Sequence, residues 1–274
     1  MKFNNGKKAY KFLNQIVGFK ELGIEAGTIN IKFLPQYDKP TKIRDEIPTL
    51  NRMGYMKIDL DPYSEDFIKT ASISDKPVLE IGCAYGFIVQ KILQDGNKII
   101  ASDLSQEHLS VLLRQTPTEN LKNLNIYPGR FPEEISLPEN SLSGVFASRI
   151  FHFLTGDEIK AGLDKIYSWL IKGGKFYFVA LTPYHDSIKD KFLTTYQKNF
   201  IDNAEWPGVI ENQWLINPDH KEYVEPYLHV FDIPQLEILL PKHGFEIEKI
   251  DYFTYPDDTT GGDKGHVGFI ATKI

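Results

Sequence analysis

The chain has 274 residues, with 31 Lys+Arg against 37 Asp+Glu and a formal net charge of −6. A composition with 42% hydrophobic and 25% charged residues is typical of a globular protein and excludes a disordered or fibrous chain. The acidic balance disfavours general binding to a phosphate backbone, so we expect no nucleic-acid partner. The single cysteine, Cys83, excludes an intrachain disulfide framework and a cysteine-rich metal site. We predict no bound metal and a reducing, cytoplasmic location.

The N-terminal part of the chain shows no targeting or membrane signal. MKFNNGKKAYKFL is polar where a signal peptide has its apolar core, and no uninterrupted apolar run approaches the roughly 18 residues of a membrane span. Residues 7–20 carry apolar side chains at helical spacing and predict an amphipathic helix packed on the protein. Residues 21–75 show no clear pattern. We therefore assign residues 1–75 to a helical and irregular segment.

From residue 76 onward, short apolar runs alternate with helical periods. Strands are predicted at 77–82, 98–103, 124–127, 144–147 and 175–180, with helices at 87–94, from 105, and from a capping box at 155–158 to a stop at 173. This alternation predicts a parallel sheet with helices on both faces. A last helix from 232 to 244 precedes strands 245–250 and 266–272, which have no helix between them and therefore make the sheet mixed. Residues 183–230 interrupt the alternation and predict a cap insertion.

The loop after the first of these strands reads Glu-Ile-Gly-Cys-Ala-Tyr-Gly from Glu80 to Gly86. Open parallel sheets bind ligands beyond the carboxyl ends of their strands, so this loop lies at the expected binding site. Gly82 and Gly86 allow the backbone to turn sharply and to approach a ligand closely. Asp103 ends the second strand, 23 residues after Glu80, where a carboxylate is able to accept both hydrogen bonds from a ribose diol.

Two classes of cofactor fit such a loop, the dinucleotides and S-adenosylmethionine. The carboxylate of Glu80 would repel a pyrophosphate but attract the ammonium and sulfonium groups of S-adenosylmethionine. The loop also lacks the Gly-x-Gly-x-x-Gly spacing of dinucleotide sites. Electrostatics therefore favours the sulfonium cofactor. An NAD(P)-dependent oxidoreductase and a non-catalytic, cofactor-binding regulatory protein remain as alternatives.

Residues 76–182, and more loosely 231–273, resemble the class I S-adenosylmethionine-dependent methyltransferases. VLEIGCAYG resembles the first motif of that family and ASDLS its acidic motif, while GRFPE, LPENSLSGVFASRIFHFL and LIKGGKFYFVAL are similar to its later segments in order and spacing. The resemblance implies a Rossmann-like, mixed seven-stranded α/β sheet whose last strand is antiparallel. We assign the methyltransferase domain to residues 76–274 and expect a cap over its site, formed by residues 1–75 and the insertion at 183–230.

The resemblance further implies which residues contact S-adenosylmethionine. The methionine end is expected near Glu80, Gly82, Cys83, Ala84, Gly86 and Ser148, the ribose on Asp103, and the adenine near Leu104, Gly129, Arg130 and Phe131. Arg130 departs from the family because an aspartate commonly accepts the adenine amino hydrogens there, and arginine has no acceptor. From the N-terminal segment, we expect Tyr63 to contact the cofactor carboxylate.

Methyl transfer is an in-line displacement, so the protein must chiefly position the acceptor. His152, just after the fourth predicted strand, is our candidate general base, and a structural histidine is the alternative. Four aromatic residues of the insertion are predicted to line the acceptor pocket, namely Trp206, Trp214, Tyr223 and Tyr227. We predict a small-molecule acceptor, and the sequence leaves its identity and the oligomeric state open.

Overall fold

The computed structural model of the chain describes residues 38–42, 46–218, 221–255 and 262–274. The helix predicted at 7–20 lies outside the described residues. Among those that are described, no helix combines the length and the apolar character that crossing a bilayer requires.

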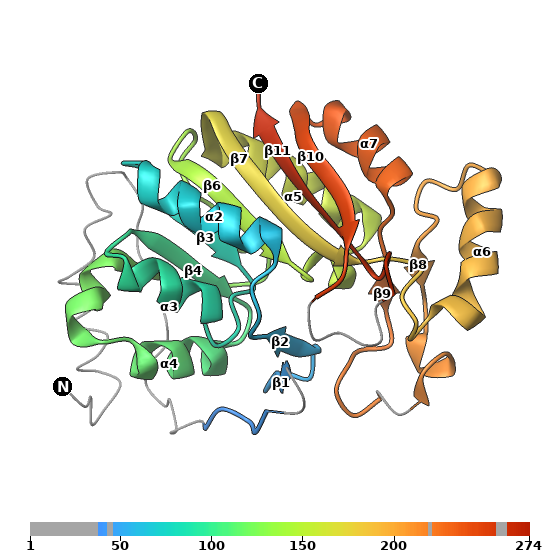
Figure 1. Cartoon of the computed structure of the whole chain (residues 1–274), viewed down its shortest axis with the longest axis horizontal. Helices are drawn as coiled ribbons and strands as arrows, with labels where there is room; N and C mark the ends of the chain where they lie inside the picture. Colours follow the sequence, from blue (N-terminus) through green and yellow to red (C-terminus); the bar gives the residue numbers. More distant parts are fainter. Residues whose placement is uncertain (1–37, 43–45, 219–220, 256–261) are drawn as a thin grey trace.

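A seven-stranded sheet with the order β10-β11-β7-β6-β3-β4-β5 forms the centre of the molecule (Figure 1). Its strands are β3 (Val78–Ile81), β4 (Ile99–Asp103), β5 (Leu124–Pro128), β6 (Leu142–Ser148), β7 (Leu170–Leu181), β10 (Phe245–Phe253) and β11 (His266–Lys273). The five strands from β7 to β5 are parallel, and β11 is antiparallel to both β7 and β10. The predicted mixed sheet is confirmed. Every residue of β3 and β4 is buried, as their continuous apolar runs require.

Helices cover both faces of the sheet, as the alternating pattern predicts. α2 (Pro62–Ile73), α3 (Phe87–Gln94) and α4 (Gln106–Gln115) share one hydrophobic core with one face of the strands. α5 (Gly156–Trp169) and α7 (Ile233–Lys242) pack into a second core on the other face (Figure 1). Each helix buries an apolar stripe at i, i+3 and i+4 spacing, which fixes its orientation on the sheet.

The predicted capping box at the start of α5 is confirmed, but the predicted end of this helix is wrong. The Glu158 carboxylate accepts the Thr155 N–H at 2.7 Å, and the Glu158 N–H donates to the Thr155 hydroxyl. The helix ends at Trp169, and β7 begins directly at Leu170. Gly173 therefore lies inside the strand, with φ of +77°, next to an irregularity in the register of β6 and β7.

Two short strands precede α2 in a stretch that carries no clear pattern in the sequence. β1 (Glu46–Pro48) and β2 (Tyr55–Lys57) pair antiparallel and form a hairpin below the sheet (Figure 1). Asp61 then caps α2, because its Oδ1 accepts the backbone N–H groups of Tyr63 and Ser64 at 2.9 Å. The hairpin and this cap bring the chain across the carboxyl ends of the parallel strands.

The insertion forms a small unit of its own beside the sheet (Figure 1). It contains α6 (Lys189–Ile201), β8 (Val209–Ile210) and β9 (Leu228–His229), and these enclose a separate hydrophobic cluster. Phe192 and Tyr196 point into that cluster, whereas Phe200 is 39% exposed.

Candidate functional site

A cavity of about 1100 Å³, counting the part open to solvent, lies at the carboxyl ends of β3, β4 and β6. Its inner wall comes from the loops that follow these strands. Its outer wall comes from residues between 49 and 64, and Tyr255 contributes from the C-terminal part of the chain. The predicted position of the site, at the crevice beyond the parallel strands, is therefore the position of this cavity.

The loop after β3 has the tight backbone that its glycines predict. Gly82 and Gly86 have φ of +70° and +77°, a region that favours glycine. A Cβ at Gly82 would come within 1.9 Å of Ile150 Cδ1. The Gly82 and Cys83 N–H groups both donate to the Ser102 carbonyl, at 2.8 and 3.0 Å. The Cys83 amide is thus used to bind the loop to β4, and burial raises the pKa of its thiol.

Glu80 presents a buried carboxylate to this cavity. The residue is 7% exposed, and its Oε2 has no hydrogen-bond partner. Burial and the nearby charge of Asp103 raise the pKa of Glu80 to about 8. A cation beside this carboxylate would lower the pKa of Glu80 again, because a neighbouring positive charge stabilises the ionised form. The geometry therefore fits a sulfonium or ammonium group and disfavours a diphosphate.

Asp103 is held firmly at the end of β4. Its Oδ2 accepts the Ala84 N–H at 2.8 Å, and its Oδ1 accepts the Ser105 N–H at 2.8 Å and a hydrogen bond from His108 Nδ1 at 3.0 Å. A carboxylate offers about four lone-pair sites, so these three bonds leave one on Oδ2. The Asp103 carboxylate is therefore able to accept one further hydrogen bond, whereas two were expected from a ribose diol.

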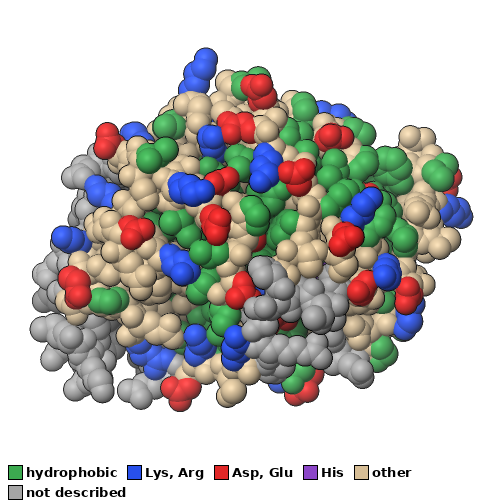
Figure 2. Space-filling model, in the orientation of Figure 1, with side chains coloured by type: hydrophobic (Ala, Val, Ile, Leu, Met, Phe, Trp, Pro, Cys, Tyr) green, Lys and Arg blue, Asp and Glu red, His purple; other side chains and the backbone are tan. Residues whose placement is uncertain are grey.

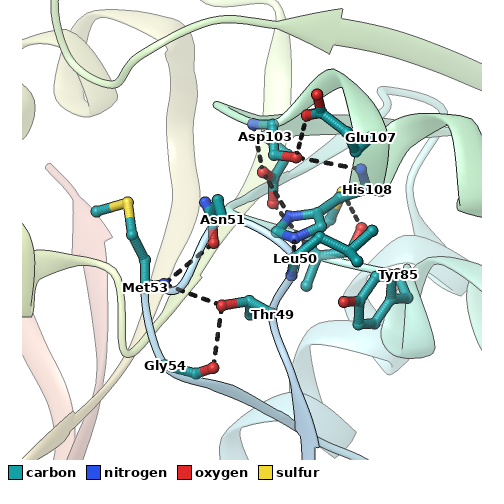
Figure 3. Close-up of polar contacts among 12 residues, drawn as sticks. Thr49, Leu50, Asn51, Met53, Gly54, Tyr85, Asp103, Glu107 and His108 are labelled. Carbon is teal, nitrogen blue, oxygen red and sulfur yellow. Dashed lines mark hydrogen bonds and ion pairs between the residues drawn. The ribbon is translucent and has the colours of Figure 1, made fainter. Parts of the chain in front are cut away.

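His108 lines the cavity but was not among the site residues predicted from the sequence. Its Nε2 accepts the Leu50 N–H at 3.0 Å, so the imidazole joins Asp103 to the segment between β1 and β2 (Figure 3). Tyr85 supports the same segment, because its ring packs against His108 and its hydroxyl donates to the Pro48 carbonyl at 2.8 Å. The sequence offers no local signal for this contact, since Leu50 and His108 are 58 residues apart.

The expected adenine end of the cavity carries a half-exposed apolar side chain. Leu104 lines the cavity and is 44% exposed, which suits a contact with a flat aromatic ring. Arg130 also lines it, and its Nη2 donates to Glu158 at 2.7 Å. The ring of Phe131 is buried and stacks on Phe151, so only a small part of this residue faces the cavity.

The cavity lining also includes two basic residues, Arg149 and Lys57, that were not among the predicted site residues. Arg149 follows Ser148 at the end of β6, and its guanidinium donates to Glu46 at 3.2 Å and to the Tyr55 carbonyl at 3.1 Å. Lys57 approaches the same Glu46 carboxylate at 3.3 Å. These contacts tie the β1–β2 hairpin to β6.

Gly86, Tyr63 and His152 were predicted site residues but are not among the residues that line the cavity. Tyr63 is 1% exposed, and its ring packs on Gly268 in the core below β11, so it does not reach a cofactor carboxylate in this cavity. His152 is also buried, and both of its ring nitrogens are used. Its Nδ1 faces the His229 carbonyl at 2.8 Å, and its Nε2 accepts the Leu181 N–H at 3.0 Å. Burial lowers the pKa of His152 to about 3.

These contacts correct the predictions for Tyr63 and His152. His152 has no free nitrogen to take a proton from an acceptor, and a structural histidine is the interpretation that the contacts support. Asp61 and Ser64, on either side of Tyr63, line the cavity in its place. Their spacing after the β1–β2 hairpin, Asp-Pro-Tyr-Ser, is a helix N-cap pattern, which was the available signal.

The four aromatic residues of the insertion do not line the cavity. Trp206 packs on Gly156 and His229, and Trp214 donates from its ring to the Val224 carbonyl at 2.9 Å. Tyr223 and Tyr227 come closer. The ring of Tyr223 lies 5.6 Å from that of Tyr55, and the Tyr227 hydroxyl donates to the Leu154 carbonyl at 3.3 Å. These two side chains support the cavity wall from behind.

Comparison with known proteins agrees with this geometry. Residues 78–174 match a family model described as a methyltransferase domain. An uncharacterized methyltransferase of Anoxybacillus flavithermus is 26% identical over 176 residues, which cover 64% of this chain and 71% of the relative. A solved S-adenosylmethionine-dependent methyltransferase of Methanosarcina mazei superposes with a TM-score of 0.59 at 19% identity, covering 79% of this chain and 99% of that one.

A further solved structure is a glycopeptide N-methyltransferase, MtfA, in complex with S-adenosylmethionine. It superposes with a TM-score of 0.52 at 15% identity and covers 77% of this chain and 86% of that one. The fold, the matched domain and the cationic preference of the cavity agree with one another. Residues 78–174 therefore form a methyltransferase domain, the sheet has the fold of the class I methyltransferases, and the chain is an enzyme that uses S-adenosylmethionine as its cofactor.

Proposed function

We propose that this enzyme methylates a small-molecule acceptor by in-line transfer. The observation that carries the proposal is the outer wall of the cavity, where residues between 49 and 64 cross the carboxyl ends of the strands. A wall of this kind leaves a confined space beside the cofactor site instead of an open surface for a macromolecule. Acidic and basic side chains are interspersed over the face drawn in Figure 2, which gives no support to an extended nucleic-acid surface.

We further propose the placement of the cofactor within the cavity. Glu80 and Ser148 would hold its methionine end, Asp103 its ribose and Leu104 its adenine. When bound, S-adenosylmethionine supplies a methyl group attached to a cationic sulfur. The leaving group is the sulfur, which becomes a neutral thioether. The protein contributes orientation, because holding the acceptor about 3–3.5 Å from the methyl carbon and collinear with the sulfur is able to supply roughly 7–11 kcal/mol.

We also propose that residues 1–75 and the insertion at 183–230 are accessory parts around a methyltransferase domain at 76–274. The contacts of the β1–β2 hairpin with Arg149 and His108 support this role for the N-terminal part. The buried free thiol of Cys83 supports our proposal of a reducing, cytoplasmic environment.

The acceptor class is testable with labelled cofactor. The purified enzyme is incubated with methyl-labelled S-adenosylmethionine and, in separate reactions, with a small-metabolite extract, total protein and total RNA. We expect label in the small-metabolite fraction. Label in protein or RNA alone would contradict the small-molecule proposal, while the cofactor assignment would stand.

A further inference from the structure

The cavity contains a buried tyrosine hydroxyl that the assignments above leave without a role. Tyr255 follows β10, is 2% exposed, and lines the cavity together with Asp61 and Ser148. Its hydroxyl donates to Asp61 Oδ2 at 3.3 Å, and the Ser148 side chain hydrogen-bonds the same hydroxyl. Ser148 is the residue that we place at the methionine end, so the Tyr255 hydroxyl lies at the end of the cavity where the methyl group is transferred.

The phenol is fixed in this position by packing on its other sides. Its ring lies 5.0 Å from the His266 ring and 5.3 Å from the Phe253 ring, measured between centroids. Lys57 Nζ lies 5.1 Å from the centre of the Tyr255 ring. A side chain held in this way presents its oxygen in one direction, which is what a positioning contact requires.

Asp61 determines what the tyrosine oxygen offers to a ligand. Its Oδ1 is occupied by the two backbone N–H groups at the start of α2, whereas its Oδ2 accepts the proton of the tyrosine. Because the phenolic proton is directed at Asp61 and the Ser148 hydroxyl occupies one lone pair of the Tyr255 oxygen, the second lone pair of this oxygen remains for a hydrogen-bond donor.

We propose that Tyr255, backed by Asp61, binds the N–H or O–H group of the methyl acceptor and takes its proton. This inference rests on the proposed function and deepens it, because it limits the acceptor to a nitrogen or oxygen nucleophile that carries a hydrogen. As the acceptor atom forms its bond to the methyl carbon and the carbon–sulfur bond breaks, the acceptor's proton passes to Tyr255 Oη. The hydroxyl proton of Tyr255 passes to Asp61 Oδ2.

The environment of the pair suits such a transfer. Burial raises the pKa of Asp61, so this carboxylate holds a proton more readily than an exposed aspartate. Burial also raises the pKa of Tyr255, so the phenol keeps its proton until another one arrives. His152 was our candidate base, but its ring nitrogens are both bound to backbone groups, and the Tyr255 pair takes over that role.

Binding measurements test this contact without knowledge of the acceptor. Sinefungin carries an ammonium group where S-adenosylmethionine carries the methyl group, whereas S-adenosylhomocysteine carries nothing there. The sinefungin N–H groups therefore imitate a donor at the transfer position. Calorimetry measures the dissociation constants of both ligands for the wild type, Tyr255→Phe and Asp61→Asn. Asparagine keeps the helix cap, because its side-chain oxygen still accepts the two backbone N–H groups.

We expect Tyr255→Phe to raise the dissociation constant of sinefungin at least about tenfold, which is the effect of losing one hydrogen bond to a charged group. The dissociation constant of S-adenosylhomocysteine should stay within twofold of the wild-type value. Asp61→Asn is expected to raise the ratio of the sinefungin dissociation constant to the S-adenosylhomocysteine dissociation constant, as Tyr255→Phe does. Tyr184→Phe is the matched control, since it removes a tyrosine hydroxyl bound at 2.8 Å to another buried carboxylate, Asp232, outside the cavity lining. Tyr184→Phe should leave the affinities for both ligands unchanged.

Two results would overturn the inference. The first is an equal loss of affinity for both ligands in Tyr255→Phe, which would mean that the phenol only packs in the cavity wall. The second is no change in either ligand. Wild-type protein that bound neither compound would instead overturn the cofactor placement in the proposed function, and the inference with it.

Discussion

His108 Nδ1 lies 3.0 Å from Asp103 Oδ1, and the other nitrogen of the same imidazole accepts the Leu50 N–H (Figure 3). Since Nε2 is an acceptor in this arrangement, Nδ1 carries the hydrogen that is donated to the carboxylate. One side chain therefore orients the proposed ribose ligand and also fixes the outer wall of the cavity. Substitutions at position 108 are able to remove the contact with Asp103 and the contact with Leu50 separately.

Asparagine and glutamine at position 108 each replace one of the two ring nitrogens. The substitution His108→Asn is expected to keep the bond to Asp103 and lose the bond to Leu50, whereas His108→Gln is expected to do the reverse. We expect S-adenosylhomocysteine to bind His108→Gln more weakly, by a factor of about ten, because Asp103 loses an orienting hydrogen bond worth roughly 1–2 kcal/mol. His108→Asn should retain more affinity but lose hydrogen-exchange protection at the Leu50 amide.

Calorimetry and amide exchange together check this expectation. Equal affinity in both variants, with Leu50 protected in both, would show that the imidazole does not link the two parts of the site.

The raised pKa of Glu80 predicts proton release when a cationic ligand binds. At pH 7 the carboxyl of the ligand-free protein is largely protonated, because its pKa of about 8 lies above the solution pH. A sulfonium or ammonium beside it favours ionisation, so binding should release up to about one proton. Calorimetry in buffers of different ionisation enthalpy measures this release, and Glu80→Gln should abolish it.

The same group affects stability with a definite sign. Because folding raises the pKa of Glu80 above its ordinary value, its stabilising contribution is present below about pH 4.5 and is lost as the pH rises towards 8. The free energy of unfolding of ligand-free Glu80→Gln should therefore depend less on pH across this window. An unchanged slope would show that the carboxylate is not buried as described.

The buried histidines predict a loss of stability in acid. Burial lowers the pKa of His152 to about 3 and that of His229 to about 4. Each binds a proton more weakly in the folded chain than in the unfolded chain, so stability falls as the pH drops from about 6.5 towards 4, by at most about 1.4 kcal/mol per pH unit and histidine. Chemical denaturation at pH 7, 6 and 5 measures this slope.

His152→Asn separates the structural role from a catalytic one. The variant retains a donor for the His229 carbonyl but loses the acceptor of the Leu181 N–H, which should cost about 1–3 kcal/mol at pH 7. Its free energy of unfolding should fall less steeply towards acid pH than that of the wild type. Its affinity for S-adenosylhomocysteine should remain within twofold of the wild-type value. A selective loss of methyl transfer with full stability would restore the catalytic assignment.

The loop after β3 depends on Gly82, and Gly96 supplies a matched control. Both residues have positive φ, so alanine at either one carries a backbone cost of about 1–2 kcal/mol. A Cβ at Gly82 collides with Ile150, which lines the cavity, whereas a Cβ at Gly96 meets nothing within 4 Å. We expect Gly82→Ala to abolish cofactor binding and Gly96→Ala to preserve it. Equal affinities in the two variants would contradict the close approach of the loop to the ligand.

Local patterns in the sequence were sufficient for the strands and helices of the sheet and for the inner wall of the cavity. The run from Val78 to Gly86 combines a buried strand with two turn glycines, and Asp103 ends the next strand, so parallel pairing necessarily brings them to one edge. The period of apolar residues and the place of glycines are local properties, which is why they were readable without a structure.

The outer wall and the acceptor end were decided only by tertiary contacts. Asp61 meets Tyr255 across 194 positions of sequence, and no short pattern records such a pairing. His152 and Tyr63 show the converse, since both are near the site in sequence but point into the core. The direction of a side chain depends on which distant backbone groups satisfy its polar atoms, and for these residues only the folded chain supplies those groups.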